Sequence, residues 1–341
     1  MTPQYRNIIY SIILLILVAI VYLYRETQKK IQIEVTGETM GTTYNIKYLD
    51  NHARNFKKEI EFLLKDFNQS LSTYIPNSEI SQFNKGKKID FKRPYFYPVL
   101  LKSKEIYELS EGAFDPTVAP LVNVWGFGFT AKEKFPDSAR IDTLKKVIGF
   151  HQIEFTKTTL SKKQQGVMLD FNAIAQGYGV DVIANFLIEK GIQDFMVEIG
   201  GEILCKGLNK EGKVWTIGIS NPKYEQEGGN PIQATVELNN RALATSGNYR
   251  KFYEMGGKKY AHTIDPKTGY PVQHSLLSVS VFAPDAMTAD AIATTLMVLG
   301  LEKAKKLLEK IPQIDAFFVY TDEKGQIQTH STENIKKFIQ Q

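Results

Sequence analysis

Cysteine is almost absent from this sequence, whose 341 residues include one, Cys205. A single cysteine excludes an intramolecular disulfide, and it excludes zinc or iron–sulfur sites that need several thiolates. Cys205 lies in the apolar stretch GEILCKG. That setting indicates a packed thiol, because a reactive one requires an exposed, electropositive environment. We assign Cys205 no role.

Concentrated positive charge is also missing. The net charge is +5, lysine and glutamate are interspersed, and arginine forms no stripe. Because nucleic-acid-binding domains carry a clustered basic surface, no nucleic-acid partner is expected. The chain also lacks a repeat period and a low-complexity linker. Residues 31–341 are therefore predicted to form one domain, for which a hydrophobic content of 43% supplies a core.

One long hydrophobic run is present, at residues 8–24, which read IIYSIILLILVAIVYLY without a charge. Its length is at the short end for a helix that crosses a bilayer. No small-residue cleavage site follows it, which argues against a signal peptide. We expect residues 1–30 to form a membrane anchor, a short cytoplasmic tail plus one transmembrane helix. The basic residues after the run favour a cytoplasmic domain by the positive-inside rule.

The periodicity of the remaining chain predicts a mixed α+β fold. Alternating or apolar stretches indicate strands, and apolar residues at helical spacing indicate helices. Strands are expected within 31–50, 166–171, 193–207, 213–222, 234–247 and 314–331, and helices within 53–74, 97–112, 172–191 and 288–311. The pair at 193–207 reads as a hairpin that turns at Gly200 and Gly201.

Asp290 and Thr294 are four residues apart in a helical stretch, so their oxygens share one face. A carboxylate and a hydroxyl one turn apart suit a hard cation such as Mg²⁺. Aspartate and threonine also cap free N–H groups at helix N-termini. The residues alone leave both interpretations open.

The segment LDFNAIAQGYGVD places Asp170 and Asn172 before a helix, and Gly177 and Gly179 in its first turns. Glycine inside a helix costs about 1 kcal/mol relative to alanine. We therefore expect a strand or a ligand to approach this backbone closely. The helix N-terminus presents N–H groups that favour phosphate, although the segment lacks the Gly-x-Gly-x-x-Gly pattern of dinucleotide sites.

Two further segments allow both a chemical and a structural interpretation. EGAFDPTVAPLVNVWGFG combines Asp115 with an aromatic cluster, which suits either a flat heterocycle or a hydrophobic core. KYAHTIDPKTGYPV places His262 before a turn that contains Pro266 and Gly269. His262 is either a catalytic imidazole or an ordinary hairpin residue, and Asp265 either orients it or begins the turn.

Together the segments resemble the ApbE family of FAD:protein FMN transferases. Eight matching stretches fall in the family's order and cover nearly everything after residue 30. They are ETMGTTYNI (38–46), LSTYIPNSEISQFN (71–84), GAFDPTVAPLVNVWGFG (112–128), DFNAIAQGYGVD (170–181), EIGGEI (198–203), ATSGNYRKF (244–252), HTIDPKTGYPV (262–272) and DAMTADAIATTL (285–296).

The resemblance implies an Mg²⁺-dependent enzyme that transfers FMN from FAD to a threonine or serine hydroxyl of a partner protein through a phosphoester bond, releasing AMP. It implies that Asp290, Thr294 and the main-chain carbonyl of Ala175 bind the metal, and that His262 is the base. The positions that it assigns to the flavin site are Met40, Tyr74, Ala113, Phe114, Asp115, Asn172, Tyr178 and Ile264.

Three residues depart from the pattern of many relatives. Gln176 replaces a lysine, Glu202 replaces an aspartate, and Asn248 replaces an acidic residue. The first change removes a positive charge near the expected phosphates. Gln176 and Glu202 are not included among the predicted site residues.

Two other functions stay open. The first is an FAD pyrophosphatase that gives FMN and AMP, because water can replace the acceptor hydroxyl. The second is a non-catalytic, membrane-anchored flavin-binding protein, against which His262 argues, since binding alone needs no base.

Bacterial members of the family act outside the cytoplasmic membrane on subunits of membrane redox complexes. We therefore expect a single-pass protein of the cell inner membrane, with its catalytic domain on the periplasmic side and such a subunit as its acceptor. This orientation opposes the one that the positive-inside rule favours.

Overall fold

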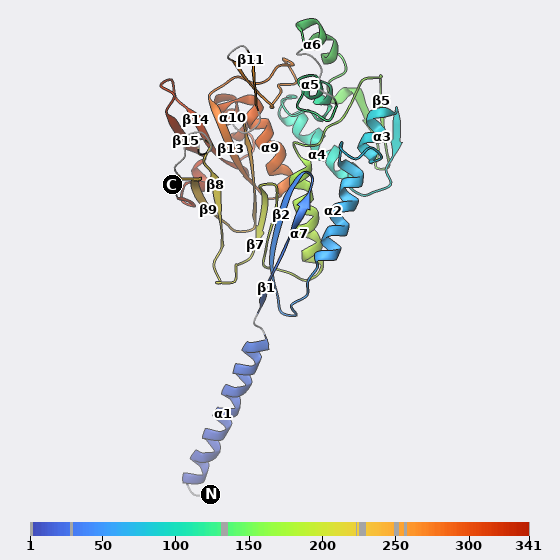
Figure 1. The fold of residues 1–341 in the computed structure, drawn as a ribbon. Helices are drawn as coiled ribbons and strands as arrows, with labels where there is room; N and C mark the ends of the chain where they lie inside the picture. The colour runs from blue at the N-terminus through green and yellow to red at the C-terminus, as the bar shows by residue number, and fades with distance from the viewer. Residues whose placement is uncertain are drawn as a thin grey trace.

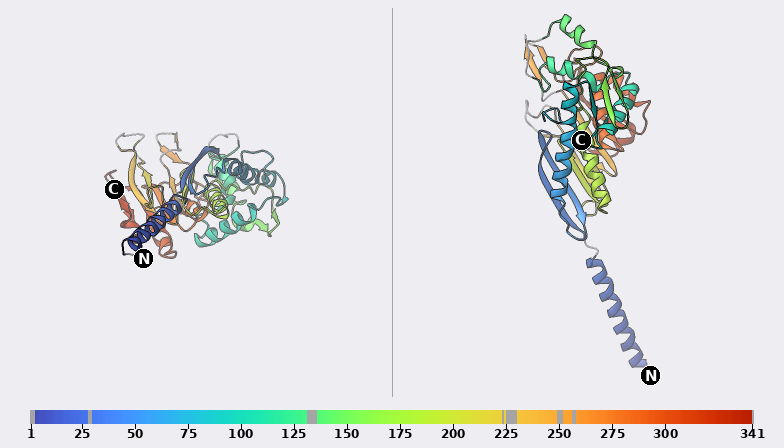
Figure 2. Two further views of the ribbon diagram at one scale, coloured as in Figure 1. Left: turned by 90° about the horizontal axis from the view of Figure 1, so that it is seen from below. Right: turned by 90° about the vertical axis from the view of Figure 1, so that its right-hand side faces the viewer.

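The computed structural model describes residues 3–27, 30–130, 136–222, 224, 230–248, 252–255 and 258–340. Helix α1 (Pro3–Thr27) extends away from the other elements (Figures 1 and 2). Within these described ranges, no helix combines the length and the apolar character needed to cross a membrane. The transmembrane helix predicted at residues 8–24 therefore has no support from the structure. Residues 1–2 and 28–29 of the predicted anchor lie outside the described residues.

The centre of the domain is an eight-stranded sheet in which every neighbouring pair is antiparallel. In spatial order its strands are β1 (Ile31–Thr39), β2 (Thr42–Asp50), β6 (Phe195–Ile199), β7 (Glu202–Lys206), β10 (Arg241–Gly247), β13 (Leu276–Ala283), β14 (Asp315–Thr321) and β15 (Ile327–Ser331). The predicted hairpins at 31–50, 193–207 and 314–331 are confirmed. So is the mixed α+β class.

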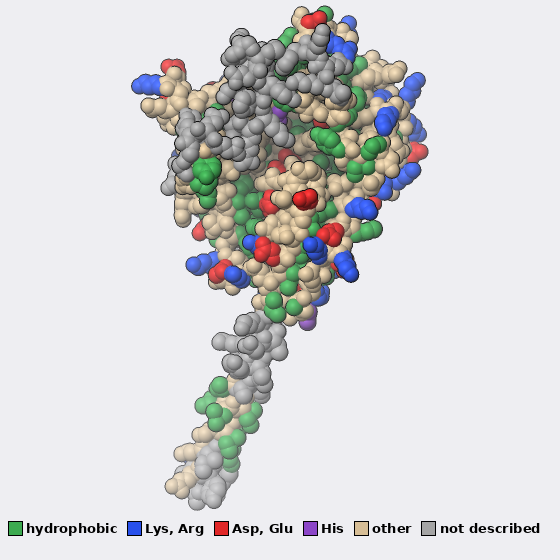
Figure 3. All heavy atoms as spheres, viewed as in Figure 1, with side chains coloured by type: hydrophobic (Ala, Val, Ile, Leu, Met, Phe, Trp, Pro, Cys, Tyr) green, Lys and Arg blue, Asp and Glu red, His purple; other side chains and the backbone are tan. Residues whose placement is uncertain are grey.

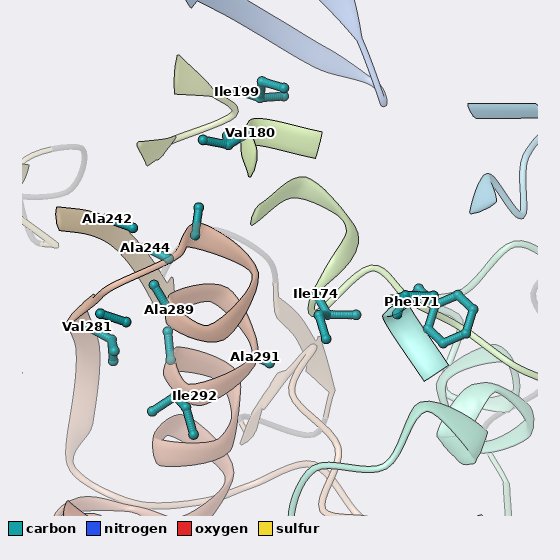
Figure 4. Packing of buried hydrophobic residues seen from close by; sticks show 14 of the residues in the cluster. Phe171, Ile174, Val180, Ile199, Ala242, Ala244, Val281, Ala289, Ala291 and Ile292 are labelled. Atoms are coloured by element: carbon teal, nitrogen blue, oxygen red, sulfur yellow. The ribbon is translucent and has the colours of Figure 1, made fainter. Parts of the chain in front are cut away.

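Two helices, α7 (Ala175–Glu189) and α9 (Ala286–Leu299), pack against one face of this sheet. Figure 4 shows Ala289 of α9 near Ala244 of β10, and Ile292 and Ala242 belong to the same core cluster. Leu243, which lies between Ala242 and Ala244 in β10, belongs instead to a second core cluster, together with residues within 215–219 and 234–238 of a small sheet. Successive side chains of a strand point to opposite faces, so β10 contributes to two cores.

The other elements surround this centre (Figure 1). Further helices in the described part of the chain include α2 (Lys57–Leu71), α3 (Glu79–Lys85), α4 (Phe96–Leu109), η1 (Pro116–Val118), α5 (Ala119–Val124), α6 (Ser138–Lys145), η2 (Phe150–Gln152), α10 (Leu301–Leu308) and α11 (Glu333–Lys336). Small sheets are formed by β3 (Lys88–Asp90), β5 (Thr159–Lys162) and β4 (Ile153–Phe155), by β16 (Ile339–Gln340), β9 (Ile232–Leu238) and β8 (Trp215–Ser220), and by β11 (Phe252–Met255) and β12 (Lys258–Ala261).

Two predicted elements differ in the structure. The strand expected before α7 is absent, because the backbone of this segment bonds to groups outside any sheet. Leu169 N donates to the side chain of Asn84, and Asp170 N donates to the carbonyl of Pro116 in η1. The helix expected at 288–311 is divided into α9 and α10 at Gly300, whose φ of 72° is incompatible with a continuous right-handed helix.

Candidate active site

The start of α7 and the first half of α9 are in close contact. Gly177 N donates a hydrogen bond of 3.0 Å to Asp290 Oδ2. A β-carbon added to Gly177 would lie 2.1 Å from the carbonyl oxygen of Ala286. The expected close approach at Gly177 is therefore confirmed, but the expected partner is wrong, because the approaching backbone is that of a helix, α9, and not a strand or a ligand.

The N-terminus of α9 is capped by other aspartates. Asp285 accepts from Thr288 N at 2.7 Å, and Asp181 of α7 accepts from the N–H groups of Ala286 and Met287, each at 2.8 Å. Asp290 lies beyond the cap, with its carboxylate turned toward α7. The capping interpretation therefore applies to Asp285 on α9, and Asp290 caps the neighbouring helix, because the N–H that it accepts belongs to the first turn of α7.

Replacing Gly177 with alanine tests this contact. The added β-carbon meets a backbone carbonyl, so we expect a loss of about 1–3 kcal/mol in the free energy of unfolding, despite a gain of about 1 kcal/mol in helix propensity. Gly179→Ala is the matched control, because its β-carbon meets Met40 Cε, the mobile end of a side chain, at 2.7 Å. Urea unfolding measures both variants. Equal stability of the two would contradict the proposed contact.

Asp290 interacts electrostatically with a second buried carboxylate, that of Glu202 at the start of β7. The two residues are 7% and 6% exposed. Burial raises the pKa of Asp290 to about 7. Burial, followed by the negative charge of Asp290, raises the pKa of Glu202 well above its usual range. The site is thus a buried acidic pair, which requires a proton or a cation for charge compensation.

These groups fit a hard divalent cation. Half-buried Thr294 lies one turn after Asp290 on α9, and Gly177 N places the start of α7, including Ala175, beside the Asp290 carboxylate. Carboxylate, hydroxyl and carbonyl oxygens are the donors that Mg²⁺ prefers. The described residues contain no group of three or more His, Cys, Asp or Glu side chains that could hold a metal ion.

The segment that contains His262 is connected to the C-terminal half of α9 through Asn248. The half-buried ring of His262 meets Phe127 edge-on, with the ring centroids 6.4 Å apart. The adjacent Thr263 donates to Asn248 Oδ1 at 2.6 Å, and the amide of Asn248 contacts the sulfur of Met297 at 3.0 Å. Met297 is on α9, so these contacts attach the histidine segment to the helix that carries Asp290. Figure 3 shows histidine and acidic side chains in a hollow of this face.

The turn after His262 has its own support. Asp265 Oδ1 accepts from Lys267 N at 2.9 Å, so Asp265 begins the turn. Gly269 adopts a φ of 83°, and its carbonyl accepts a hydrogen bond of 2.9 Å from the indole of Trp125. Trp125 is buried with Ile264 in a third core cluster. Trp125 of the aromatic cluster is therefore a core residue, whereas Phe127 lies beside the imidazole of His262.

Several predicted flavin-site residues gather near the start of α7. Met40, at the β1–β2 turn with a φ of 52°, lies against Gly179. Tyr74 is 66% exposed, and its hydroxyl interacts with the side chain of Asn172. Asn172 is exposed and is held by Asp170, which accepts from its backbone N–H at 2.7 Å. An exposed tyrosine and amide beside a helix N-terminus suit a ring and phosphates.

Other predicted flavin-site residues have their side chains in the core. The ring of Tyr178 packs edge-on against Phe67 at a centroid distance of 5.3 Å. Tyr178 itself is half-buried, whereas Ala113, Phe114 and Ile264 are buried. For these three, only main-chain atoms are available to a ligand.

Asp115 is buried and caps η1, where its Oδ1 accepts from Thr117 N at 2.8 Å and from the Thr117 hydroxyl at 2.6 Å. Burial raises its pKa from 3.8 to about 6, although the Thr117 hydrogen bonds oppose this change. The folded state therefore holds the proton of Asp115 more tightly than the unfolded state does. As pH rises from 3.8 to about 6, this carboxyl group lowers the free energy of unfolding, and above pH 6 its effect changes little.

Asp115→Asn should remove that pH dependence while keeping an oxygen for Thr117 N. A shift of two pKa units corresponds to about 3 kcal/mol, so we expect the variant to gain up to this amount relative to the unmodified protein between pH 4 and pH 6. Urea unfolding at several pH values measures the difference. Parallel curves for the two proteins would contradict the prediction.

Two residues at the site, Gln176 and Glu202, were left out of the sequence prediction. The amide nitrogen of Gln176 lies 2.5 Å from the position of a β-carbon on Gly200, so α7 meets the tip of the β6–β7 hairpin. The alternation of side chains along β7 could have indicated that Glu202 points toward the site. Glu202 shares a face with Leu204, which packs in the α7–α9 core, whereas Ile203 belongs to the opposite core.

Comparisons with known proteins agree with this arrangement. Residues 40–318 match the profile of the ApbE family. A Haemophilus influenzae protein named FAD:protein FMN transferase is 43% identical over 82% of this chain and 84% of its own. The solved Vibrio cholerae flavin transferase ApbE is 37% identical, with a TM-score of 0.81, over 91% of this chain and 99% of its own. The apo Pseudomonas stutzeri flavinyl transferase ApbE is 33% identical, with a TM-score of 0.81, over 91% of this chain and 97% of its own. This chain belongs to the ApbE family.

Proposed function

We propose that this protein is an FAD:protein FMN transferase that joins FMN to a threonine or serine hydroxyl of a partner protein through a phosphoester bond and releases AMP. Relatives of this name cover most of the chain. The observation that carries the proposal is the hydrogen bond from Gly177 N to Asp290 Oδ2. It joins the two helices on which the predicted metal ligands lie.

The chemistry follows from the proposed roles. An acceptor hydroxyl is a poor nucleophile near neutral pH, and His262 accepts its proton as the oxygen attacks the phosphorus of the FMN portion. The phosphorus–oxygen bond to the AMP portion breaks, and AMP leaves with the bridging oxygen. A base of this kind contributes about 10²- to 10⁴-fold in rate.

Asp290, Thr294 and the carbonyl of Ala175 are the proposed Mg²⁺ ligands. When bound, Mg²⁺ supplies positive charge that stabilises the diphosphate as the leaving group departs. The proposed part of the protein is to hold these oxygens in place through the α7–α9 contact. The buried acidic pair supports this assignment, because such a pair is costly without a counter-charge.

Met40, Tyr74 and Asn172 are proposed to contact FAD with their side chains. Ala113, Phe114 and Ile264 are proposed to contact it through the backbone. Asp115 and Tyr178 are proposed to support the flavin site through the structure around it. Asp115 caps η1, and the ring of Tyr178 packs against Phe67.

An in-gel fluorescence assay tests the function. The purified protein is mixed with FAD, Mg²⁺ and a candidate acceptor, and flavin fluorescence on the acceptor band is the expected result. FMN and AMP without labelled acceptor would indicate a pyrophosphatase. FAD that binds but stays intact would indicate a binding protein, and either result would overturn the proposal.

We further propose that α1 associates with the cell inner membrane, that the catalytic domain lies on the periplasmic side, and that the acceptor is a subunit of a membrane redox complex. The support is the exposure of apolar side chains on α1, such as Leu14 at 63% and Leu15 at 68%. Large exposed apolar surfaces favour contact with a membrane or a partner. Membrane fractionation, followed by protease treatment of spheroplasts, tests both the association and the side.

A further inference from the structure

We infer that Glu202 is an additional residue of the cation site, and that its carboxylate shares the bound divalent ion with Asp290. The inference rests on the proposed metal-dependent function and extends it to a residue outside the predicted ligand set. Two independent features support it: the place of Glu202 in the fold, and a buried oxygen without a donor.

The first feature is position. Glu202 pairs with Ile199 at the tip of the β6–β7 hairpin, next to Gly200. The amide nitrogen of Gln176 lies 2.5 Å from the position of a β-carbon on Gly200. Gly177, which follows Gln176 in α7, donates its N–H to Asp290. Because Glu202 points to the face that α7 and α9 cover, its carboxylate enters the same interior space as that of Asp290.

The second feature is the unpartnered oxygen. Glu202 is 6% exposed, and its Oε2 has no hydrogen-bond partner among the described residues. The side chains that act on it electrostatically are Asp290 and Glu198, both acidic. A buried oxygen without a donor, in a carboxylate that also feels the charge of a second buried carboxylate, is costly unless a proton or a cation compensates it.

The neighbouring Gln176 strengthens this requirement. Its amide is neutral and adjoins the hairpin tip, so it supplies no charge to balance the acidic pair. Two carboxylates neutralise a divalent ion, and oxygen ligands of this kind suit Mg²⁺ or Mn²⁺. We therefore assign to the metal ion the positive charge that balances the carboxylates of Glu202 and Asp290.

The test is Mn²⁺ binding in the absence of FAD, measured on the full chain by the EPR signal of free Mn²⁺. Glu202→Gln keeps the shape and removes the charge, and we expect the Kd for Mn²⁺ to rise by about 10- to 100-fold. Glu198→Gln is the matched control. It lies on the same hairpin, where its carboxylate accepts from Gly201 N at 2.8 Å. Because its charge also acts on Glu202, we expect the Kd for Mn²⁺ to rise by a smaller amount, about fivefold or less, than in Glu202→Gln.

Thermal unfolding provides a second measurement, which does not depend on activity. Mg²⁺ should raise the Tm of the unmodified protein more than that of Glu202→Gln, because a tighter ligand stabilises the folded state more. In EDTA the variant should be at least as stable as the unmodified protein, since a buried charge has been removed. Equal Tm increases on adding Mg²⁺ would overturn the inference.

The outcomes separate this inference from the proposed function. Unchanged Mn²⁺ affinity in Glu202→Gln, with binding lost in Asp290→Asn, would overturn the role of Glu202 and leave the transferase intact. Flavin transfer in EDTA by a protein that binds no Mn²⁺ would overturn the metal site itself. A third outcome is that the unmodified protein binds Mn²⁺ but does not transfer FMN, and that Glu202→Gln does not bind Mn²⁺. This outcome would overturn the proposed function and support the cation site.

Discussion

Replacing Asp290 with asparagine is expected to lower the rate of FMN transfer by about 10²- to 10⁴-fold and to abolish the response to Mg²⁺. Metal ions contribute several kcal/mol of charge stabilisation in such reactions, and about 1.4 kcal/mol corresponds to a tenfold change in rate. Asparagine keeps an oxygen for the N–H group of Gly177 but loses the negative charge. Single-turnover fluorescence labelling of the acceptor across an Mg²⁺ titration measures the effect.

Asp285→Asn is the control for Asp290→Asn. Asp285 lies on the same helix terminus, where it accepts from Thr288 N and from the Thr288 hydroxyl at 2.9 Å. Asparagine is also a good N-cap residue, so we expect a stability change below about 1 kcal/mol and an Mg²⁺ response like that of the unmodified protein. If Asp290→Asn shows the unmodified Mg²⁺ titration, Asp290 is not a ligand.

Replacing His262 with alanine is expected to reduce FMN transfer by about 10²- to 10⁴-fold while leaving the Kd for FAD nearly unchanged. The reason is that the imidazole acts on the acceptor hydroxyl, whereas FAD binding depends on other groups. Rapid-quench transfer kinetics and equilibrium FAD titration give the two quantities separately. Added imidazole should restore part of the rate, which a merely structural role of the ring would not allow.

His274→Ala is the control for His262→Ala. His274 lies at the C-terminal end of α9, where its Nε2 contacts the carbonyl of Met297 at 2.7 Å. Its loss should reduce stability by about 1 kcal/mol and leave transfer intact. Equal rates for His262→Ala and the unmodified protein would remove His262 from the mechanism.

Local sequence was a good guide wherever neighbours in the chain decide the structure. The hairpin at 193–207 was predicted from Gly200 and Gly201, and the structure gives both a positive φ, 67° and 107°. The turn after His262 was predicted in the same way. Such signals are reliable because one residue's allowed φ, or a side chain bonding to a nearby N–H group, fixes the turn.

Local sequence was a poor guide where contacts come from far along the chain. The apolar stretch at 166–171 resembles a strand, yet its N–H groups bond to Asn84 and to the carbonyl of Pro116. Asp181 was not selected by the sequence, although it caps a helix that begins at Ala286. No pattern around Asp181 indicates that partner, because the helix is brought to it by the fold.

The sequence by itself determined the fold class, the family and most of the chemical groups of the site, since these depend on periodicity, turn residues and ordered motifs. Only the tertiary structure decided that Gly177 serves contact with α9, that Asp115 is a cap, and that Glu202 interacts electrostatically with Asp290. The physical reason is that burial and charge pairing are properties of space. A carboxylate has a raised pKa or lacks a donor because of what packs around it, and residues distant in the chain do that packing.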